Sequence, residues 1–343
     1  VKELRSLGIQ PDILICRSAQ PIPQDMCEKM AMFCDVDADA VFQNLTARSI
    51  YEVPVLLEKQ GLDEVVLRKL DVDVTNHPLN MDEWHDMVER MLKEYDRKVT
   101  LGVVGKYVEL QDSYISLTEA LRHAAMANEA NLEIKWINAE LAETGEVDLE
   151  AELKGVDAIL VPGGFGDKGL EGKISAIKYA RENKVPFFGI CLGMQCAVVE
   201  YARHIGMADA NTTEAKPETA YPVIDIVPEQ KDVEEKGAMR LGLYPCKVAA
   251  GSFTEKAYGE ALIYERHRNR YEVNNAFREE LEKNGLVIAG ALPNGRLVEI
   301  VELPESVHPW FVGVQFHPEL KSRPTNPHPL FRDFIAAALK EQK

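Results

Sequence analysis

The sequence predicts an α/β fold with a mainly parallel central sheet. Between residues 99 and 204, short apolar runs alternate with segments of helical periodicity. One of these runs, 187–190, passes directly into an amphipathic stretch at 192–204. Strands that alternate with helices are joined by right-handed crossovers, so the strands should lie parallel. Functional side chains are then expected at the carboxyl ends of the strands.

Residues 1–78 predict a small, separate α/β unit. The run D-I-L-I-C at 12–16 follows Gln10-Pro11 and predicts a buried strand. Helical patterns follow at 24–33 and 50–70. We expect these residues to be the end of a larger domain, because the chain begins at Val1 with a segment that already has a helical pattern.

Residues 79–97 predict a linker helix between two domains. Asn80 and Glu83 form a plausible helix start. One helical face then carries apolar side chains, namely Trp84, Val88, Met91, Leu92 and Tyr95. This spacing is more typical of a packed surface than of a ligand site.

A second domain is predicted over residues 98–343. Strands are expected at 99–104, 132–137, 158–161 and 187–190, and helices at 114–127, 170–181 and 192–204. Beyond residue 220 the pattern turns to short β runs at 261–265, 271–274, 287–291, 298–301 and 312–316. Pro293-Asn294-Gly295 predicts a hairpin turn, and 329–340 a final helix.

Composition excludes several classes of protein. The 343 residues suffice for about two domains. A formal charge of −17 argues against a nucleic-acid polymer or an anionic membrane as partner. The six cysteines lack the density of a disulfide scaffold, and no apolar run is long enough to span a bilayer. We therefore expect a cytoplasmic enzyme with reduced thiols.

Cys191 is the predicted nucleophile. It stands between the strand and the helix, in the sequence G-I-C-L-G, with Gly189 and Gly193 two positions away on each side. Glycines there leave room for a tight strand-to-helix turn, as in the nucleophile elbow of serine hydrolases. The helix N-terminus favours the thiolate form of a cysteine. A buried structural cysteine is the alternative.

Two other motifs supply what a thiolate nucleophile needs. His317 and Glu319 flank a proline just after the strand at 312–316, so that the carboxylate can orient an imidazole base. The glycine-rich sequence P-G-G-F-G at 162–166 follows another strand. One of its backbone N–H groups, together with that of Leu192, can form an oxyanion hole.

These three motifs resemble those of the class I (triad) glutamine amidotransferases. Further stretches are similar to the CTP synthase family, namely residues 1–18, G-K-Y-V-E-L-Q-D-S-Y-I-S-L-T-E-A-L at 105–121, E-R-H-R-N-R-Y-E-V-N-N at 265–275 and V-Q-F-H-P-E at 314–319. The resemblance implies a flavodoxin-like amidotransferase domain preceded by a partial α/β synthetase domain of the P-loop type. It covers nearly the whole chain.

The resemblance also implies roles for matching residues. Cys191 is the nucleophile, His317 the base and Glu319 its orienting partner. The residues that match glutamine-binding positions are Gly164, Leu192, Gly193, Met194, Gln195, Glu214 and Arg270. Of these, Glu214 would bind the α-ammonium group and Arg270 the α-carboxylate. A surface salt bridge is the alternative role for both.

In the synthetase part, Lys29 matches a position that contacts the pyrimidine nucleotide. Ala47 matches one that contacts ATP through its backbone. The phosphate loop and the lysine-rich UTP segment of the family do not occur in this sequence, so we expect glutamine hydrolysis at most from this chain. Lys168 stands where the family usually has an arginine, and lysine lacks the planar fork of that side chain.

For the full-length enzyme the family implies ATP-dependent amination of UTP to CTP, with ATP and Mg²⁺, GTP as an allosteric activator, and a homotetramer. No cofactor or metal is expected within this chain. The alternatives are another triad amidotransferase, a γ-glutamyl hydrolase and a non-catalytic assembly module.

Overall fold

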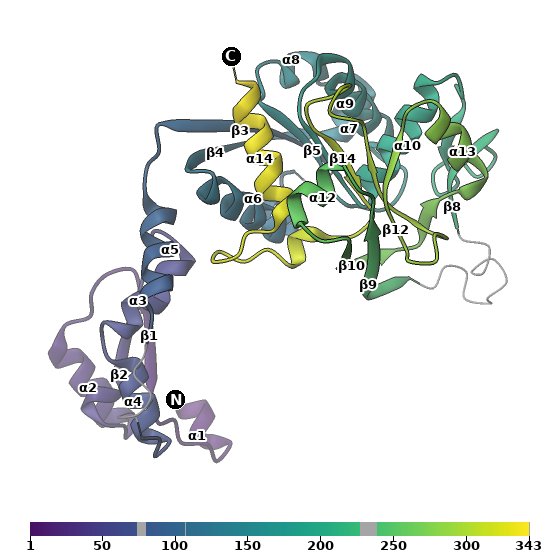
Figure 1. The fold of residues 1–343 in the computed structure, drawn as a ribbon. Coiled ribbons are helices and arrows are strands. Elements are labelled where there is room, and N and C mark those ends of the chain that lie inside the picture. Colours follow the sequence, from purple (N-terminus) through teal and green to yellow (C-terminus); the bar gives the residue numbers. More distant parts are fainter. Residues whose placement is uncertain (74–79, 107, 227–238, 343) are drawn as a thin grey trace. The chain divides into compact units, whose positions relative to one another are not determined.

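The computed structural model of the chain describes residues 1–73, 80–106, 108–226 and 239–342. The chain forms two compact units, Val1–Lys93 and Glu94–Lys343, and each is described by itself (Figure 1). The boundary expected between residues 78 and 79 lies outside the described residues, as does Tyr107 of the G-K-Y motif.

The first unit contains a two-stranded parallel sheet. Strand β1 (Leu14–Ser18) pairs with β2 (Val41–Leu45) along its whole length. The strand expected at 12–16 is therefore present with a shift of two residues, and the helix expected at 24–33 is α2 (Gln24–Cys34). Strand β2 was not predicted, because Gln43 and Asn44 interrupt its apolar pattern.

The helical pattern expected at 50–70 is confirmed, but it is divided into separate elements. The segment forms η2 (Ile50–Glu52), α3 (Val53–Glu58) and α4 (Leu62–Lys69). Gly61 separates the last two helices with φ of +76°, a left-handed conformation that a continuous helix does not contain. The unit also holds α1 (Lys2–Ser6) and η1 (Ala38–Ala40).

Helix α5 (Asp82–Leu92) is shorter than the linker helix expected at 79–97. Asn80 Oδ1 accepts a hydrogen bond from Asp82 N–H at 3.1 Å, but the N-cap residue is Met81, one position after the expected helix start. Trp84 Nε1 donates to Tyr51 O at 2.9 Å. The apolar face of α5 thus packs on the first unit.

The second unit is organised around a nine-stranded sheet with the order β10-β9-β12-β13-β14-β6-β5-β3-β4. Five neighbouring strands are parallel, namely β14 (Phe311–Val314), β6 (Phe187–Ile190), β5 (Ala158–Val161), β3 (Arg97–Gly105) and β4 (Ala130–Asn138). The remaining strands are antiparallel, namely β13 (Val298–Glu302), β12 (Val287–Ala291), β9 (Arg240–Val248) and β10 (Leu262–Asn269). The predicted α/β class is confirmed, and the sheet is mixed.

Several elements were not predicted from the sequence. A second sheet has the order β11-β8-β7, in which β11 (Tyr271–Val273) matches the run expected at 271–274, while β8 (Tyr221–Ile226) and β7 (Ala210–Thr212) were not expected. Glycine and proline inside β9 and proline inside β8 break the apolar runs by which strands are recognised. The short helices are α7 (Ala139–Thr144), α8 (Leu149–Leu153), α12 (Phe253–Tyr258) and α13 (Asn275–Lys283), and the 3₁₀ turns are η3 (Gln111–Tyr114) and η4 (Pro318–Leu320).

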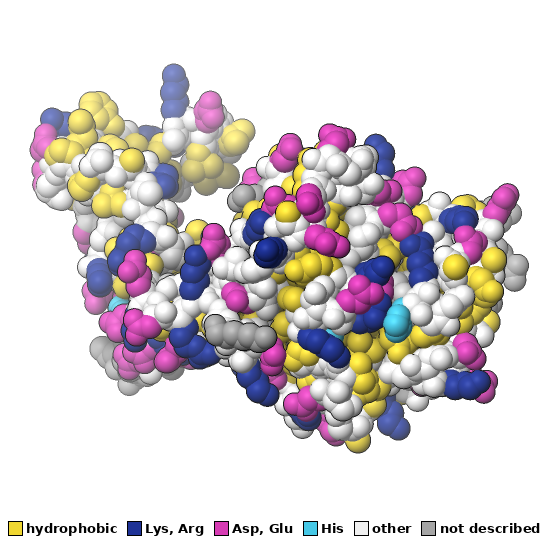
Figure 2. All heavy atoms as spheres, turned by 90° about the horizontal axis from the view of Figure 1, so that it is seen from above, with side chains coloured by type: hydrophobic (Ala, Val, Ile, Leu, Met, Phe, Trp, Pro, Cys, Tyr) yellow, Lys and Arg dark blue, Asp and Glu magenta, His cyan; other side chains and the backbone are white. Residues whose placement is uncertain are grey.

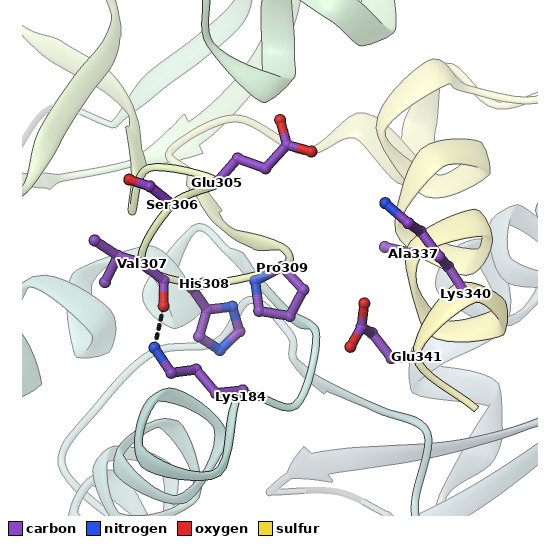
Figure 3. A pocket seen from close by; sticks show the side chains of 9 residues that line it. All are labelled: Lys184, Glu305, Ser306, Val307, His308, Pro309, Ala337, Lys340 and Glu341. Carbon is purple, nitrogen blue, oxygen red and sulfur yellow. Dashed lines mark hydrogen bonds between the residues drawn. The ribbon is translucent and has the colours of Figure 1, made fainter. Parts of the chain in front are cut away.

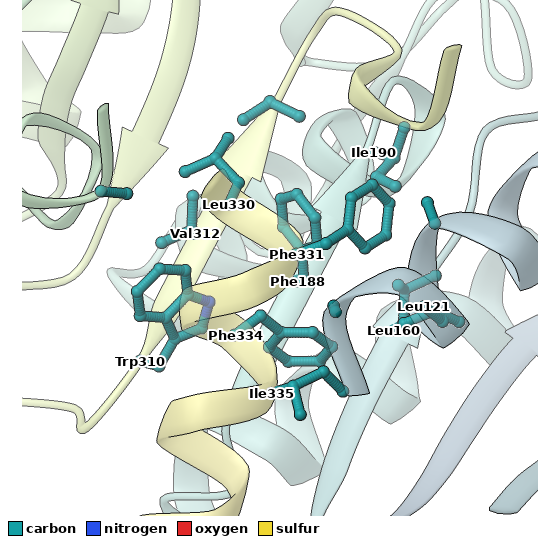
Figure 4. Close-up of a cluster of buried hydrophobic side chains, with 14 of the residues drawn as sticks. Leu121, Leu160, Phe188, Ile190, Trp310, Val312, Leu330, Phe331, Phe334 and Ile335 are labelled. Atoms are coloured by element: carbon teal, nitrogen blue, oxygen red, sulfur yellow. The ribbon is translucent and has the colours of Figure 1, made fainter. Parts of the chain in front are cut away.

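Helices cover both faces of the large sheet. Helices α6 (Ile115–Ala127) and α14 (Pro329–Glu341) pack on one face, and α9 (Leu170–Asn183) and α10 (Leu192–His204) on the other. Figure 4 shows the first of these cores, in which the Phe188 ring of β6 lies 5.2 Å from Phe331 and 5.6 Å from Phe334 of α14, between ring centroids. Strand β6 is therefore buried on both faces, as the uninterrupted apolar run predicts.

The connections place a topological switch point at the carboxyl edge of the sheet. From β3 the chain crosses to β4 on one side, and then returns to β5 on the other side of β3. In such sheets, ligands bind where the direction of winding reverses. The loops that follow β3 and β5 border this point.

Acidic and basic side chains are intermingled over the described face drawn in Figure 2, with no continuous basic area. In the described part of the chain, no helix combines the length and the apolar character needed to cross a bilayer.

A glycine substitution tests how tightly α9 packs. A Cβ on Gly172 would lie 2.1 Å from the carbonyl oxygen of Ala139, which is backbone and cannot yield without moving β4 or α7. In an open helix Gly→Ala is stabilising. Here Gly172→Ala should lower the free energy of unfolding by about 1–3 kcal/mol in urea titrations. Ser175→Ala, at an exposed position of the same helix, is the control and should change it by less than about 0.5 kcal/mol. A G172A protein as stable as wild type would contradict this packing.

Candidate active site

Cys191 occupies a strained turn between β6 and α10. Its backbone has φ of +52° and ψ of −105°, a combination that L-residues rarely adopt, and its side chain is buried. A Cβ on Gly189 would come within 2.8 Å of the Gly193 backbone, and one on Gly193 within 2.1 Å of the Val161 carbonyl oxygen. Both glycines are therefore required by close backbone approach, as the elbow interpretation predicts.

The base and its carboxylate follow the neighbouring strand. Strand β14 pairs in parallel with β6, and Cys191 N–H donates to Val314 O at 2.7 Å. His317, three residues further on, donates a hydrogen bond from Nδ1–H to Glu319 Oε1 at 2.7 Å. The sheet register thus brings the cysteine and the His–Glu pair together.

Gly163 shows how close these side chains lie. A Cβ at this glycine would be 2.8 Å from Cε1 of His317 and 3.4 Å from Cβ of Cys191. The imidazole and the cysteine therefore border the same point of the loop after β5. His317 Nε2 is buried and has no hydrogen-bond partner among the described residues, so this nitrogen is available to the thiol or to a substrate.

Electrostatics favour a protonated imidazole. Burial on its own lowers the pKa of His317, since it disfavours the charged form. Interactions with Cys191 and with Glu319 act in the opposite direction and prevail, and they raise this pKa to about 10. His317 can therefore hold a proton at neutral pH and deliver it to a leaving group.

Gly164 and the first turn of α10 provide the candidate oxyanion hole. The first intrahelical bond of α10 runs from Gln195 N–H to Cys191 O, at 3.1 Å, so the preceding N–H groups have no acceptor within the helix. Gly164 lies beside this turn, because a Cβ on it would be 3.5 Å from Cδ2 of Leu192. Leu192 and Gly164 are thus brought together as predicted.

Gln195 and Met194 point into the protein. The Gln195 side-chain amide donates to Tyr271 O at 2.9 Å and to Gln315 Oε1 at 3.1 Å. Met194 is fully buried, and its Cγ would lie 3.1 Å from a Cβ on Gly313. Their side chains support the site, while Gly193 packs directly against the backbone of Val161 at the end of β5.

Gln315 was not recognised from the sequence as a site residue. It is fully buried, and its Nε2 lies 3.7 Å from Sγ of Cys191. The only signal was its position in V-Q-F-H-P-E, two residues before His317. It links the nucleophile to Gln195.

Glu214 and Arg270 both influence the phenol group of Tyr271 through their charges. Burial, and then the charge of Glu214, raise the pKa of the Tyr271 phenol, and Arg270 opposes this rise. Glu214 Oε1 also accepts a hydrogen bond from Gly166 N–H at 3.1 Å, which ties it to the P-G-G-F-G loop. The chain thus offers a substrate an acidic group at the glycine loop, Glu214, and an exposed basic group next to Tyr271 in the sequence, Arg270.

Phe165 and Arg268 lie at the entrance. The Arg268 guanidinium is 5.6 Å from the centroid of the Phe165 ring, and the Arg268 carbonyl oxygen is 3.9 Å from Cys191 Sγ. Phe165 is 42% exposed. Lys168 is also exposed, in the loop that follows.

The predicted nucleotide residues lie in the first unit. Lys29 is on α2 and pairs with Asp25 at 3.2 Å, at the surface, and Ala47 is half-buried after β2. In the described part of the chain, no group of three His, Cys, Asp or Glu residues is arranged to hold a metal ion. Lys29 and Ala47 offer no carboxylate, so they do not by themselves fit Mg²⁺.

A surface pocket elsewhere is not part of this site (Figure 3). It is lined by Lys184, Glu305, Ser306, Val307, His308, Pro309, Ala337, Lys340 and Glu341. Lys184 and Pro309 precede β6 and β14, so the pocket lies at the amino edge of these strands, opposite the edge that carries Cys191. The Lys184 ammonium donates to Val307 O.

The His317–Glu319 pair can be tested by titration. The raised pKa means that the folded protein binds this proton more tightly than the unfolded chain does, where the pKa is 6.5. The resulting stabilisation is complete below pH 6.5 and is lost as the pH rises towards about 10. Glu319→Gln removes the charge that favours the imidazolium, so the NMR titration midpoint of His317 should fall by about one unit or more.

Asp167→Asn is the matched control, because Asp167 is an exposed carboxylate at the loop after β5. It should leave the midpoint of His317 within about 0.3 units of wild type. A wild-type midpoint near 6.5, or one that does not respond to Glu319→Gln, would contradict the pairing.

Comparison with known proteins agrees with this geometry. The family described as "Glutamine amidotransferase class-I" matches residues 109–337, and "CTP synthase N-terminus" matches residues 1–72. A CTP synthase of Clostridium kluyveri is 55% identical over 100% of this chain and 63% of its own length. One of Carboxydothermus hydrogenoformans is 56% identical, with the same two coverages.

A solved structure is also similar. It is titled "Trypanosoma brucei CTPS - glutaminase domain with bound acivicin", and it is 37% identical with a TM-score of 0.66. The match covers 71% of this chain and 95% of that one. The chain spans 63% of the length of the two curated relatives above. It therefore belongs to the class-I glutamine amidotransferases and, among them, to the CTP synthase family.

Proposed function

We propose that this chain hydrolyses glutamine as the ammonia-producing part of a glutamine-dependent CTP synthase. One observation carries the proposal: Cys191 is held in a strained turn next to a His317 that is hydrogen-bonded to Glu319 at 2.7 Å. A structural cysteine needs neither the strained backbone nor the adjacent His–Glu pair.

Binding of glutamine rests on the two charged groups near Tyr271. Arg270 has the planar, two-pronged guanidinium that suits an α-carboxylate. Glu214 carries the charge that suits an α-ammonium, and only one of its oxygens is used by Gly166 N–H in the hydrogen bonds described above. These two contacts orient the γ-carboxamide towards Cys191.

Acylation begins when the Cys191 thiolate attacks the γ-carbonyl carbon. The Sγ–C bond forms, and the π electron pair of the carbonyl moves to its oxygen, which the N–H groups of Gly164 and Leu192 stabilise. The electron pair then returns, the C–N bond breaks, and His317 gives its proton to the departing nitrogen, so that ammonia leaves. The product on the enzyme is a γ-glutamyl thioester.

Deacylation reverses the roles of the same groups. His317, now neutral, takes a proton from water, and the resulting hydroxide attacks the thioester carbon. The C–S bond breaks, glutamate leaves, and the thiolate is restored beside a protonated His317. Glu319 keeps the imidazole oriented in both halves of the reaction and stabilises its charged form.

The reaction of the whole protein is a further part of this proposal. In it, ATP phosphorylates UTP at O4, ammonia from the glutaminase site displaces this phosphate, and GTP acts as an activator. Lys29 and Ala47 would contribute to nucleotide binding. We also propose a cytoplasmic location and a homotetramer for the full-length enzyme. The family assignment supports these points.

An ammonia-release assay on the full-length protein tests the proposal. Cys191→Ser should lower the rate of glutamine hydrolysis by at least about a thousandfold, because the alcohol is not ionised by His317. Cys34→Ser, a thiol of the first unit, is the control and should leave the rate unchanged within about twofold.

Two results would contradict the proposal in different ways. Absence of ammonia release from wild type, even with GTP, UTP and ATP, would favour a non-catalytic assembly module. Rapid hydrolysis that does not depend on any of these nucleotides would favour a γ-glutamyl hydrolase instead.

A further inference from the structure

A buried lysine lies beside the candidate oxyanion hole. Lys173 belongs to the first turn of α9, and its side chain is only 3% exposed. Lysine is among the residues least often found fully buried unless it is paired. Its location therefore calls for a functional or structural reason.

Lys173 makes no ion pair or side-chain hydrogen bond with the rest of the described chain. The charged or titratable groups that face it are Lys106 after β3, Glu140 and Glu143 of α7, and Cys196 of α10. Lys106 pairs with Glu140 at 3.9 Å. Burial is the largest influence on the Lys173 ammonium and lowers its pKa, while Cys196 and the two glutamates oppose this.

The ammonium group is aimed at the glycine loop. Nζ of Lys173 would lie 4.0 Å from a Cβ on Gly164, on the side of the glycine that also approaches Leu192 Cδ2. Gly164 and Leu192 are the two residues whose N–H groups were assigned to the oxyanion. Lys173 thus lies next to the point at which negative charge develops during acylation.

A cation held in a site of low polarity acts strongly on nearby charge. A buried ammonium group also costs stability when, as here, it forms no ion pair with the carboxylates that face it, those of Glu140 and Glu143. An oxyanion that forms only in the transition state would compensate this charge at that moment. An interaction that is stronger in the transition state than in the bound substrate raises kcat rather than substrate affinity.

We propose that Lys173 is a positioning residue for acylation, whose ammonium group stabilises, through the Gly164 loop, the oxyanion formed when Cys191 adds to glutamine. This inference rests on the glutaminase function proposed above. In the step concerned, the Sγ–C bond forms and the carbonyl electron pair moves to oxygen. Lys173 supplies charge and transfers no proton.

The test compares Lys173→Met with Lys178→Met in the full-length protein. Methionine has a similar length without the charge, and Lys178 is exposed on the same helix. Lys173→Met should lower kcat for glutamine hydrolysis about tenfold and leave KM within about twofold. Lys173→Arg should retain part of kcat, and Lys178→Met should match wild type.

Two additional readouts separate this role from a structural one. Alkylation of Cys191 by iodoacetamide forms no oxyanion, so its rate should be the same in Lys173→Met and wild type. The urea midpoint of Lys173→Met should equal or exceed that of wild type, because an unpaired buried charge is removed. A lower urea midpoint together with slower alkylation would show that Lys173 is a structural anchor.

The remaining outcomes are equally decisive. An unchanged kcat in Lys173→Met would overturn the inference and leave the glutaminase function intact. Absence of ammonia release from wild type would instead overturn the glutaminase function, and with it this role for Lys173.

Discussion

The site depends on the contact between the first turn of α10 and the end of β5. A Cβ on Gly193 would lie 2.1 Å from the Val161 carbonyl oxygen, so the helix can approach the sheet only because this residue has no side chain. That approach forces Cys191 into its strained backbone, at a cost of about 1–3 kcal/mol. The buried side chains of β6 and α10 offset this cost, since Phe187, Phe188 and Met194 are fully enclosed in the two cores on either side of the sheet. The fold thus presents the thiol at the carboxyl edge beside Gly163 and His317.

Two side chains that can carry positive charge, His317 and Lys173, lie at this edge. His317 is hydrogen-bonded through Nδ1 to Glu319, and its Nε2 has no hydrogen-bond partner among the described residues. Lys173 is buried close to Gly164, in the loop after β5. The burial of the Lys173 ammonium group is unfavourable for stability alone, and both side chains suit a reaction that creates and discharges an oxyanion. Glu214 is tied to Gly166, so the loop that forms the oxyanion hole and the carboxylate that would bind the substrate ammonium are connected.

Much of the site could be predicted from three short sequence motifs, because each motif reflects a constraint on the local backbone. The glycines around Cys191 reflect close backbone approach, and the register of β14 with β6 turns two distant motifs into neighbours.

What the sequence did not reveal depends on tertiary contacts. Gln315 gains its role only because β14 places it 3.7 Å from the cysteine, and the burial of Lys173 depends on the packing of α7, α9 and α10 around it. The break at Gly61 was missed because this glycine lies within a continuous helical pattern of apolar residues. Strands β8 and β9 were missed because glycine or proline interrupts their apolar runs. The triad and the substrate-binding roles themselves remain predictions about chemistry.

The most direct test of the central claim is to look for the covalent intermediate. The full-length protein is mixed with glutamine, quenched in acid during turnover and digested, and the peptide that contains Cys191 is examined by mass spectrometry. A γ-glutamyl group should be found on Cys191, and it should be absent from Cys191→Ser. A protein that releases ammonia while carrying the adduct on another residue, or that carries none when turnover is slowed by Glu319→Gln, would contradict the assignment of Cys191 as the acylated nucleophile.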